Sequence, residues 1–170
     1  GHAYASNEAN FLAALADETV TTITVSHNID LSTALEVTRT VTVNLNGKTL
    51  SVSKDTEGNG VFMVTDGTLT LDGKGTVNGL DKSGWSMAVW ATNNGKVIIK
   101  DGYFTNLGAH SEEDSDHYDL IYAKNGGTVI INGGTFEAHT PKWTLNLKDS
   151  DGSSITVQGG TFVGVNPAEV

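Results

Sequence analysis

The chain has 170 residues with 20 acidic and 10 basic side chains, so its formal net charge is −10. This balance repels nucleic acid and anionic membrane surfaces, and we expect neither as a partner. The sequence has no cysteine, which excludes disulfides and thiolate metal sites. The length suits one domain, and no apolar run reaches the length of a membrane span. The 20 glycines and 2 prolines favour many tight corners over long helices.

The N-terminal residues divide into two expected segments. Residues 1–5 are expected to be a disordered start, because Gly1-His2 has the form of a scar left by cleavage of an expression tag. Residues 6–17 predict a short amphipathic helix with Ser6 as its N-cap, and this helix would cover the first coil of the domain at 18–170. Its apolar face would consist of Phe11, Leu12 and Leu15.

Residues 18–170 contain one motif that recurs about six times with insertions between the copies. Each copy has a run in which apolar and polar residues alternate, which is typical of a β-strand with one buried face. The inward pairs of this strand are Ile23/Val25, Val43/Leu45, Leu69/Leu71, Val97/Ile99, Val129/Ile131 and Ile155/Val157. One supersecondary unit is therefore repeated along the chain.

Two more short strands belong to each unit. A second strand precedes the motif in the later copies, with inward pairs Phe62/Val64, Val89/Ala91, Ile121/Ala123 and Leu145/Leu147. A third strand follows a glycine corner, with inward residues Leu50, Val77, Phe104, Phe136 and Phe162. Glycine would supply the positive φ that each sharp corner needs.

Three strands per coil predict an all-β fold, a single right-handed parallel β-helix of about six coils. Phe104, Phe136 and Phe162 would then stack inside it. A β-sandwich is the alternative, but it explains less well why equivalent positions keep the same residue type. No capping helix is expected after Phe162, so either a longer chain or another subunit would cover the last coil.

The strings "SNEANFLAAL" and "VNLNGKTLS", followed by coils that contain "GGTF", resemble the pectin-lyase-like right-handed β-helix superfamily. "DLIYAKNGGTVIINGGTF" and "TPKWTLNLKDSDGSSITVQGGTFVGVNP" resemble β-helix modules of phage virion proteins (head fibres and tail appendages) and of gut bacterial surface proteins. The resemblance implies one of two functions. Enzymes of the superfamily cleave acidic polysaccharides, whereas the virion and surface modules act as structural or adhesive parts.

The residues that the enzymes need are largely missing from this chain. The resemblance implies that a lyase would combine a Ca²⁺-binding carboxylate cluster with a strong base, usually arginine. The sequence has one arginine, Arg39, and no Asp or Glu stacks on it at the coil period. The hydrolases need an adjacent Asp-Asp pair, which does not occur here. The sequence therefore predicts a protein that is not an enzyme and has no catalytic residues, with a polysaccharide lyase or glycoside hydrolase as the alternative.

The longest departure from the repeat is the acidic loop at 107–120. Its candidate ligands for a metal ion are Asp114, Asp116 and Asp119. Oxygen ligands in such a loop suit Ca²⁺, and the flanking His110 and His117 together with carboxylates would suit Zn²⁺ or Ni²⁺. The spacing is not that of an EF-hand. A solvated acidic loop without a metal is the alternative.

Outward-facing residues provide two more candidate surfaces. Candidate glycan- or partner-binding residues on the second strand and in the corners before it are Trp85, Trp90, Tyr122, Trp143 and Asn146. Candidate subunit contacts on outward positions are Met63, Ile98 and Ile130. The aromatic row fits an oligomer interface, a surface covered by the acidic loop, or a platform on which sugar rings stack.

These patterns predict a structural and adhesive module of a virion or bacterial cell surface, outside the cell. The expected partners are a glycan or structural protein subunits, and a homotrimer with aligned axes is the expected assembly.

Overall fold

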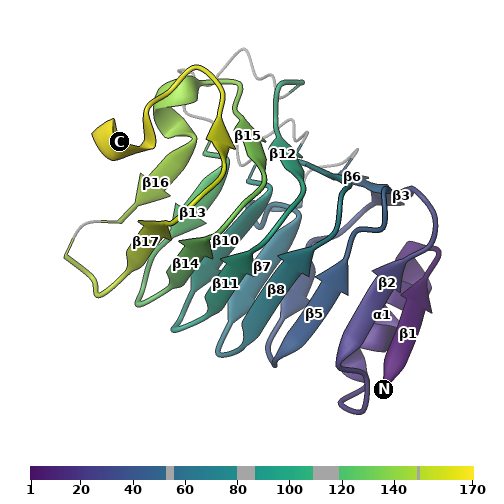
Figure 1. The fold of residues 1–170 in the computed structure, drawn as a ribbon. Coiled ribbons are helices and arrows are strands. Elements are labelled where there is room, and N and C mark those ends of the chain that lie inside the picture. The colour runs from purple at the N-terminus through teal and green to yellow at the C-terminus, as the bar shows by residue number, and fades with distance from the viewer. Residues whose placement is uncertain (53–55, 80–86, 109–118, 149) are drawn as a thin grey trace.

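The computed structural model describes residues 1–52, 56–79, 87–108, 119–148 and 150–170. Within these ranges the strands form three parallel sheets that wind into a right-handed parallel β-helix, with an α-helix, α1 (Glu8–Ala16), at its N-terminal end (Figure 1). The predicted all-β solenoid with a short N-terminal helix is therefore confirmed.

Sheet A is built from the strand that the repeat predicted most clearly. In the described part of the chain its strands, in spatial order, are β1 (His2–Ala5), β2 (Thr22–Val25), β5 (Val41–Asn44), β8 (Thr68–Asp72), β11 (Lys96–Ile99), β14 (Thr128–Ile131) and β17 (Ser154–Val157). Every pairing is parallel. The predicted equivalent positions lie opposite each other except between β5 and β8, where the prediction is wrong by two residues: Val43 lies opposite Leu71, not Leu69.

Sheets B and C complete each coil. Sheet B contains β3 (Ile29–Leu31), β6 (Thr49–Val52), β9 (Thr76–Asn78), β12 (Tyr103–Thr105), β15 (Thr135–Glu137) and β18 (Thr161–Phe162). Sheet C contains β4 (Leu35–Val37), β7 (Phe62–Thr65), β10 (Val89–Thr92), β13 (Ile121–Ala123) and β16 (Leu145–Leu147). In the part of the chain that the structure describes, two short 3₁₀ helices, η1 (Pro141–Trp143) and η2 (Pro167–Glu169), lie near the C-terminal end.

The core lies between the three sheets and consists of ladders of like residues. The predicted inward residues of every coil before the last are buried. Phe104, Phe136 and Phe162 form the expected stack, with ring centroids 5.2 Å and 4.9 Å apart and nearly parallel planes. Burial of these apolar ladders is the main source of stability.

The two glycines of the "GGTF" corner serve different purposes. Gly134 has φ 96°, in the left-handed region that residues with a Cβ adopt only at an energetic cost. Gly133 does not have a left-handed φ, but a Cβ there would lie 2.3 Å from the carbonyl oxygen of Lys100 on the preceding coil. The first glycine therefore allows two coils to approach, and the second turns the chain so that Phe136 enters the core.

The N-terminal end differs from the sequence prediction in three respects. Residues 2–5 are not disordered but form β1, which pairs in parallel with β2 and buries Ala5 against the core. The N-cap of α1 is Asn7, not Ser6, because the Asn7 side chain accepts a hydrogen bond from the backbone N–H of Asn10 at 2.9 Å. The buried face of α1 contains the predicted Phe11 together with Ala14, and the predicted Leu15 packs partly buried against the core, while Leu12 is exposed.

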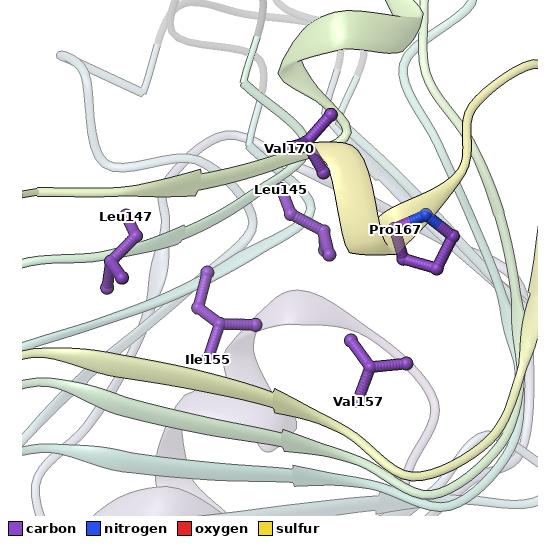
Figure 2. Close-up of a pocket in the computed structure, with 6 residues that line it drawn as sticks. All are labelled: Leu145, Leu147, Ile155, Val157, Pro167 and Val170. Atoms are coloured by element: carbon purple, nitrogen blue, oxygen red, sulfur yellow. The ribbon is translucent and has the colours of Figure 1, made fainter.

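The C-terminal end leaves part of the core uncovered. The last coil has the same inward pattern as the others, but Leu147 and Val157 are 41% and 37% exposed. Figure 2 shows their side chains with those of Leu145 and Ile155 around a cavity of about 90 Å³, with Pro167 and Val170 of the η2 segment along its other side.

Candidate functional site

The aromatic row predicted on sheet C has the expected register. Trp90 lies opposite Met63 on one side and Tyr122 on the other, and Tyr122 lies opposite Asn146. The rings of Trp90 and Tyr122 are stacked, with centroids 6.0 Å apart and an interplanar angle of 17°. The structure therefore brings these four residues together on neighbouring strands.

Trp90 is nevertheless poorly accessible. Its side chain is 9% exposed, and its indole N–H donates a hydrogen bond to the carbonyl oxygen of Asn59 at 2.9 Å. A sugar needs an open ring face for stacking, and Trp90 offers little of one in this conformation. Tyr122 is half-buried, and burial together with the charges of Asp119 and Asp151 raises the pKa of its phenol.

The C-terminal part of this row is polar. The Asn146 amide donates to a carboxylate oxygen of Asp119 at 3.1 Å, and the Asn106 amide donates to the Asp119 carbonyl oxygen at 3.3 Å. Trp143 belongs to η1 and is half-buried, with the ammonium of Lys142 5.8 Å from its ring centroid. The remaining candidate of this group, Trp85, lies outside the described residues.

The acidic loop is described only in part. Asp114 and Asp116 lie outside the described residues, whereas Asp119 is buried and hydrogen-bonded as above. Among the described residues no cluster of three metal-binding side chains is found. Ca²⁺ binding by the loop stays a prediction.

The predicted contact residues Ile98 and Ile130 are neighbours on the outer face of sheet A. They lie opposite each other on β11 and β14, and both are half-buried. The same row continues on both sides with uncharged residues, namely Thr22, Thr42, Thr70 and Thr156. This defines an uncharged row across six coils of a strongly acidic chain, and we call it the sheet A row.

A cleft that the sequence did not reveal lies on the outside of the corner between sheets A and B. Its volume is about 180 Å³, and it is lined by Lys74, Gly75, Asp101, Gly102, Tyr103 and Thr135. These residues come from three successive coils, so only the winding of the chain brings them together. We call this site the Tyr103 cleft.

The Tyr103 side chain is held in place by the next coil. Its hydroxyl donates a hydrogen bond to the carboxylate of Glu137 at 2.5 Å. Burial, followed by this contact with Glu137, raises the pKa of the Tyr103 phenol, so the hydroxyl stays protonated at neutral pH. At the equivalent position the neighbouring coils have Thr76 and Thr135. Alignment of the repeats would therefore have shown Tyr103 as an aromatic residue in a threonine row.

Comparison with protein families agrees with this architecture. The model of the pectate lyase-like adhesive domain matches residues 2–158, which is nearly the whole chain. The chain belongs to the pectate lyase-like adhesive domain family. No curated protein and no solved structure matches it. In the described part of this adhesive domain, no helix is long and apolar enough to cross a membrane.

The arginine of this adhesive domain contacts backbone carbonyls. The Arg39 guanidinium donates to the carbonyl oxygens of Leu15 at 2.8 Å, Val20 at 2.5 Å and Ala14 at 2.9 Å. These contacts satisfy carbonyls at the C-terminal end of α1 and attach the helix to the first coils. Arg39 therefore ties the N-terminal helix to the solenoid.

Proposed function

We propose that this chain is a non-enzymatic adhesive and structural module of a virion or bacterial cell surface, which binds a glycan or a partner subunit. The conclusion that the chain is not an enzyme rests on the hydrogen bonds that Arg39 makes. The pectin-lyase-like enzymes that the chain resembles need a strong base beside bound Ca²⁺. Arg39 is the one arginine in the sequence, and backbone carbonyls already hold its guanidinium. The adhesive description of the family supports the same conclusion.

The sheet A row supports a contact between copies of the chain with their axes aligned, as in a trimer. Each copy carries a formal net charge of −10, so two copies repel each other wherever acidic side chains meet. The six members of the sheet A row, from Thr22 on β2 to Thr156 on β17, are all uncharged, so charge repulsion between copies is avoided along this row. Its half-buried isoleucines would gain from losing contact with water.

One experiment tests the adhesive function against the enzymatic alternative. The protein is incubated with polygalacturonate and other acidic polysaccharides in the presence of Ca²⁺, and new unsaturated or reducing ends are measured. We expect no product beyond that of a heat-denatured control. Product that accumulates with time and protein concentration would overturn the non-enzymatic proposal.

A second experiment tests the subunit contact. Light scattering after gel filtration measures the mass of the wild type and of an Ile98→Lys variant. Leu107→Lys is the matched control, because Leu107 is exposed and follows β12 of sheet B, away from the sheet A row. We expect a trimer that dissociates only in Ile98→Lys. A wild type that stays monomeric at high concentration would contradict this part of the proposal.

A further inference from the structure

We propose that the Tyr103 cleft binds a single sugar ring of a neutral glycan. The inference rests on the adhesive function proposed above and assigns its glycan to a site. The aromatic row on sheet C, which the sequence favoured for this role, has its tryptophan only 9% exposed at the centre. The Tyr103 cleft instead combines an aromatic ring, a carboxylate and an ammonium group around an open space.

The ring of Tyr103 is preorganised for stacking. Tyr103 and Glu137 both point outward from sheet B, and Glu137 lies on the next coil, two residues beyond the position opposite Tyr103. The hydrogen bond between them therefore draws the phenol along the surface of the sheet and fixes it there. A ring that is fixed before binding loses little conformational entropy when a ligand packs on it.

The polar groups of the cleft suit sugar hydroxyls. One oxygen of the Asp101 carboxylate accepts the backbone N–H of Gly102 at 2.8 Å, which orients the group and leaves its second oxygen to accept from a ligand. Within the described residues, the Lys74 ammonium makes no hydrogen bond or ion pair, so it can donate to a ligand. Adjacent sugar hydroxyls both donate and accept, and a pair of them matches this carboxylate and ammonium.

The charge of the site selects a neutral ligand. An acidic sugar would gain contact with Lys74, but its carboxylate would also come close to the Asp101 carboxylate, which lines the same cleft. A polyanionic glycan would also be repelled by the net charge of −10. The volume of about 180 Å³ lies below the roughly 300–1,000 Å³ typical of pockets for drug-sized ligands, so the cleft holds one ring and leaves the rest of a glycan outside.

The test is a binding measurement on the folded protein with defined probes. Neutral probes are mannan, β-glucan and oligomers of N-acetylglucosamine, and acidic probes are polygalacturonate and hyaluronan. The variants are Tyr103→Ala, Tyr103→Phe, Lys74→Ala and Tyr122→Ala, with Tyr4→Ala as a control for loss of an exposed tyrosine. Circular dichroism shows which variants are folded, and Lys74→Ala tests the cleft without removing the hydrogen bond to Glu137.

We expect the wild type to bind at least one neutral probe more tightly than either acidic probe. Tyr103→Ala should weaken this binding by about tenfold or more, because it removes the stacking surface. Tyr103→Phe should weaken it by only a few-fold, since the ring stays. Lys74→Ala should also weaken binding, whereas Tyr122→Ala and Tyr4→Ala should leave it unchanged.

Four results would overturn the inference, and they separate it from the proposed function. If glycan binding survives Tyr103→Ala, or is lost in Tyr122→Ala, the Tyr103 cleft is not the binding site, but the adhesive function is still supported. Preference for an acidic probe removes the neutral ligand class. If the wild type binds no glycan, both the inference and the proposal that the chain binds a glycan are wrong. The proposal that it binds a partner subunit is tested separately, by the light-scattering measurement of mass.

Discussion

The two ends of the solenoid differ in how well their inward side chains are covered. At the N-terminal end, α1 places Phe11 completely out of contact with water, and its ring meets Phe62 edge to face at 6.3 Å. At the C-terminal end, Val157 occupies a position equivalent to the fully buried Ile131 but is 37% exposed. The repeat therefore decides which way a side chain points. A neighbouring coil or a helix decides whether the side chain is buried.

The largest effect that tests this comparison is expected from Phe11→Ala. Because Phe11 is fully buried, its truncation should lower the free energy of unfolding by about 3–5 kcal/mol. The matched variant is Phe162→Ala in the last coil, where the ring is only partly buried and the loss should be clearly smaller. Urea denaturation of both variants measures the difference. Equal losses would mean that the two ends are not covered as differently as the structure indicates.

An intermediate effect is expected from Arg39→Ala. This change removes the guanidinium that joins α1 to the first coils, and with it the donors to the carbonyl oxygens of Leu15, Val20 and Ala14. We expect a loss of about 2 kcal/mol in the free energy of unfolding.

Arg39→Lys is the informative control, because a lysine keeps the charge but cannot reproduce the planar set of donors. It should recover only part of the lost stability. Full recovery by lysine would show that charge alone, and not the set of contacts, attaches the helix.

The smallest effect is expected from Val157→Ser at the open end. Since this side chain is already partly exposed, the variant should lose about 0.5 kcal/mol or less in thermal or urea unfolding. Ile131→Ser, at the equivalent position one coil earlier, serves as the comparison and should be far more destabilising because it places a hydroxyl in the core. A large loss from Val157→Ser would indicate that the last coil is covered in solution.

Much of the fold follows from residue patterns. Alternation along each repeat gave the inward pairs, and the Phe104–Phe136–Phe162 stack follows because equivalent residues of successive coils lie opposite each other. Strand β1 was missed because His2–Ala5 is short and contains small alanines, which give little strand signal by themselves. Pairing with β2, a tertiary contact, makes it a strand.

The candidate sites were harder to predict for a physical reason. Periodicity placed Trp90 on an outward face, but it carries no information on what covers that face, and the side chain is nearly buried. The Tyr103 cleft combines Lys74, Asp101 and Thr135 from three coils, so no continuous motif marks it. The signal that was present, a tyrosine in a row of threonines, becomes visible only when the repeats are aligned in register.

The most direct test of the account is a nuclear magnetic resonance titration of the ¹⁵N-labelled protein with the neutral oligosaccharide that it binds. We predict shift changes centred on the backbone amides of Gly75, Gly102, Tyr103 and Thr135, with the sugar signals remaining those of the intact ligand. Changes centred on Tyr122 and Asn146 would contradict the assigned site. New signals from a cleaved sugar would contradict the adhesive function itself.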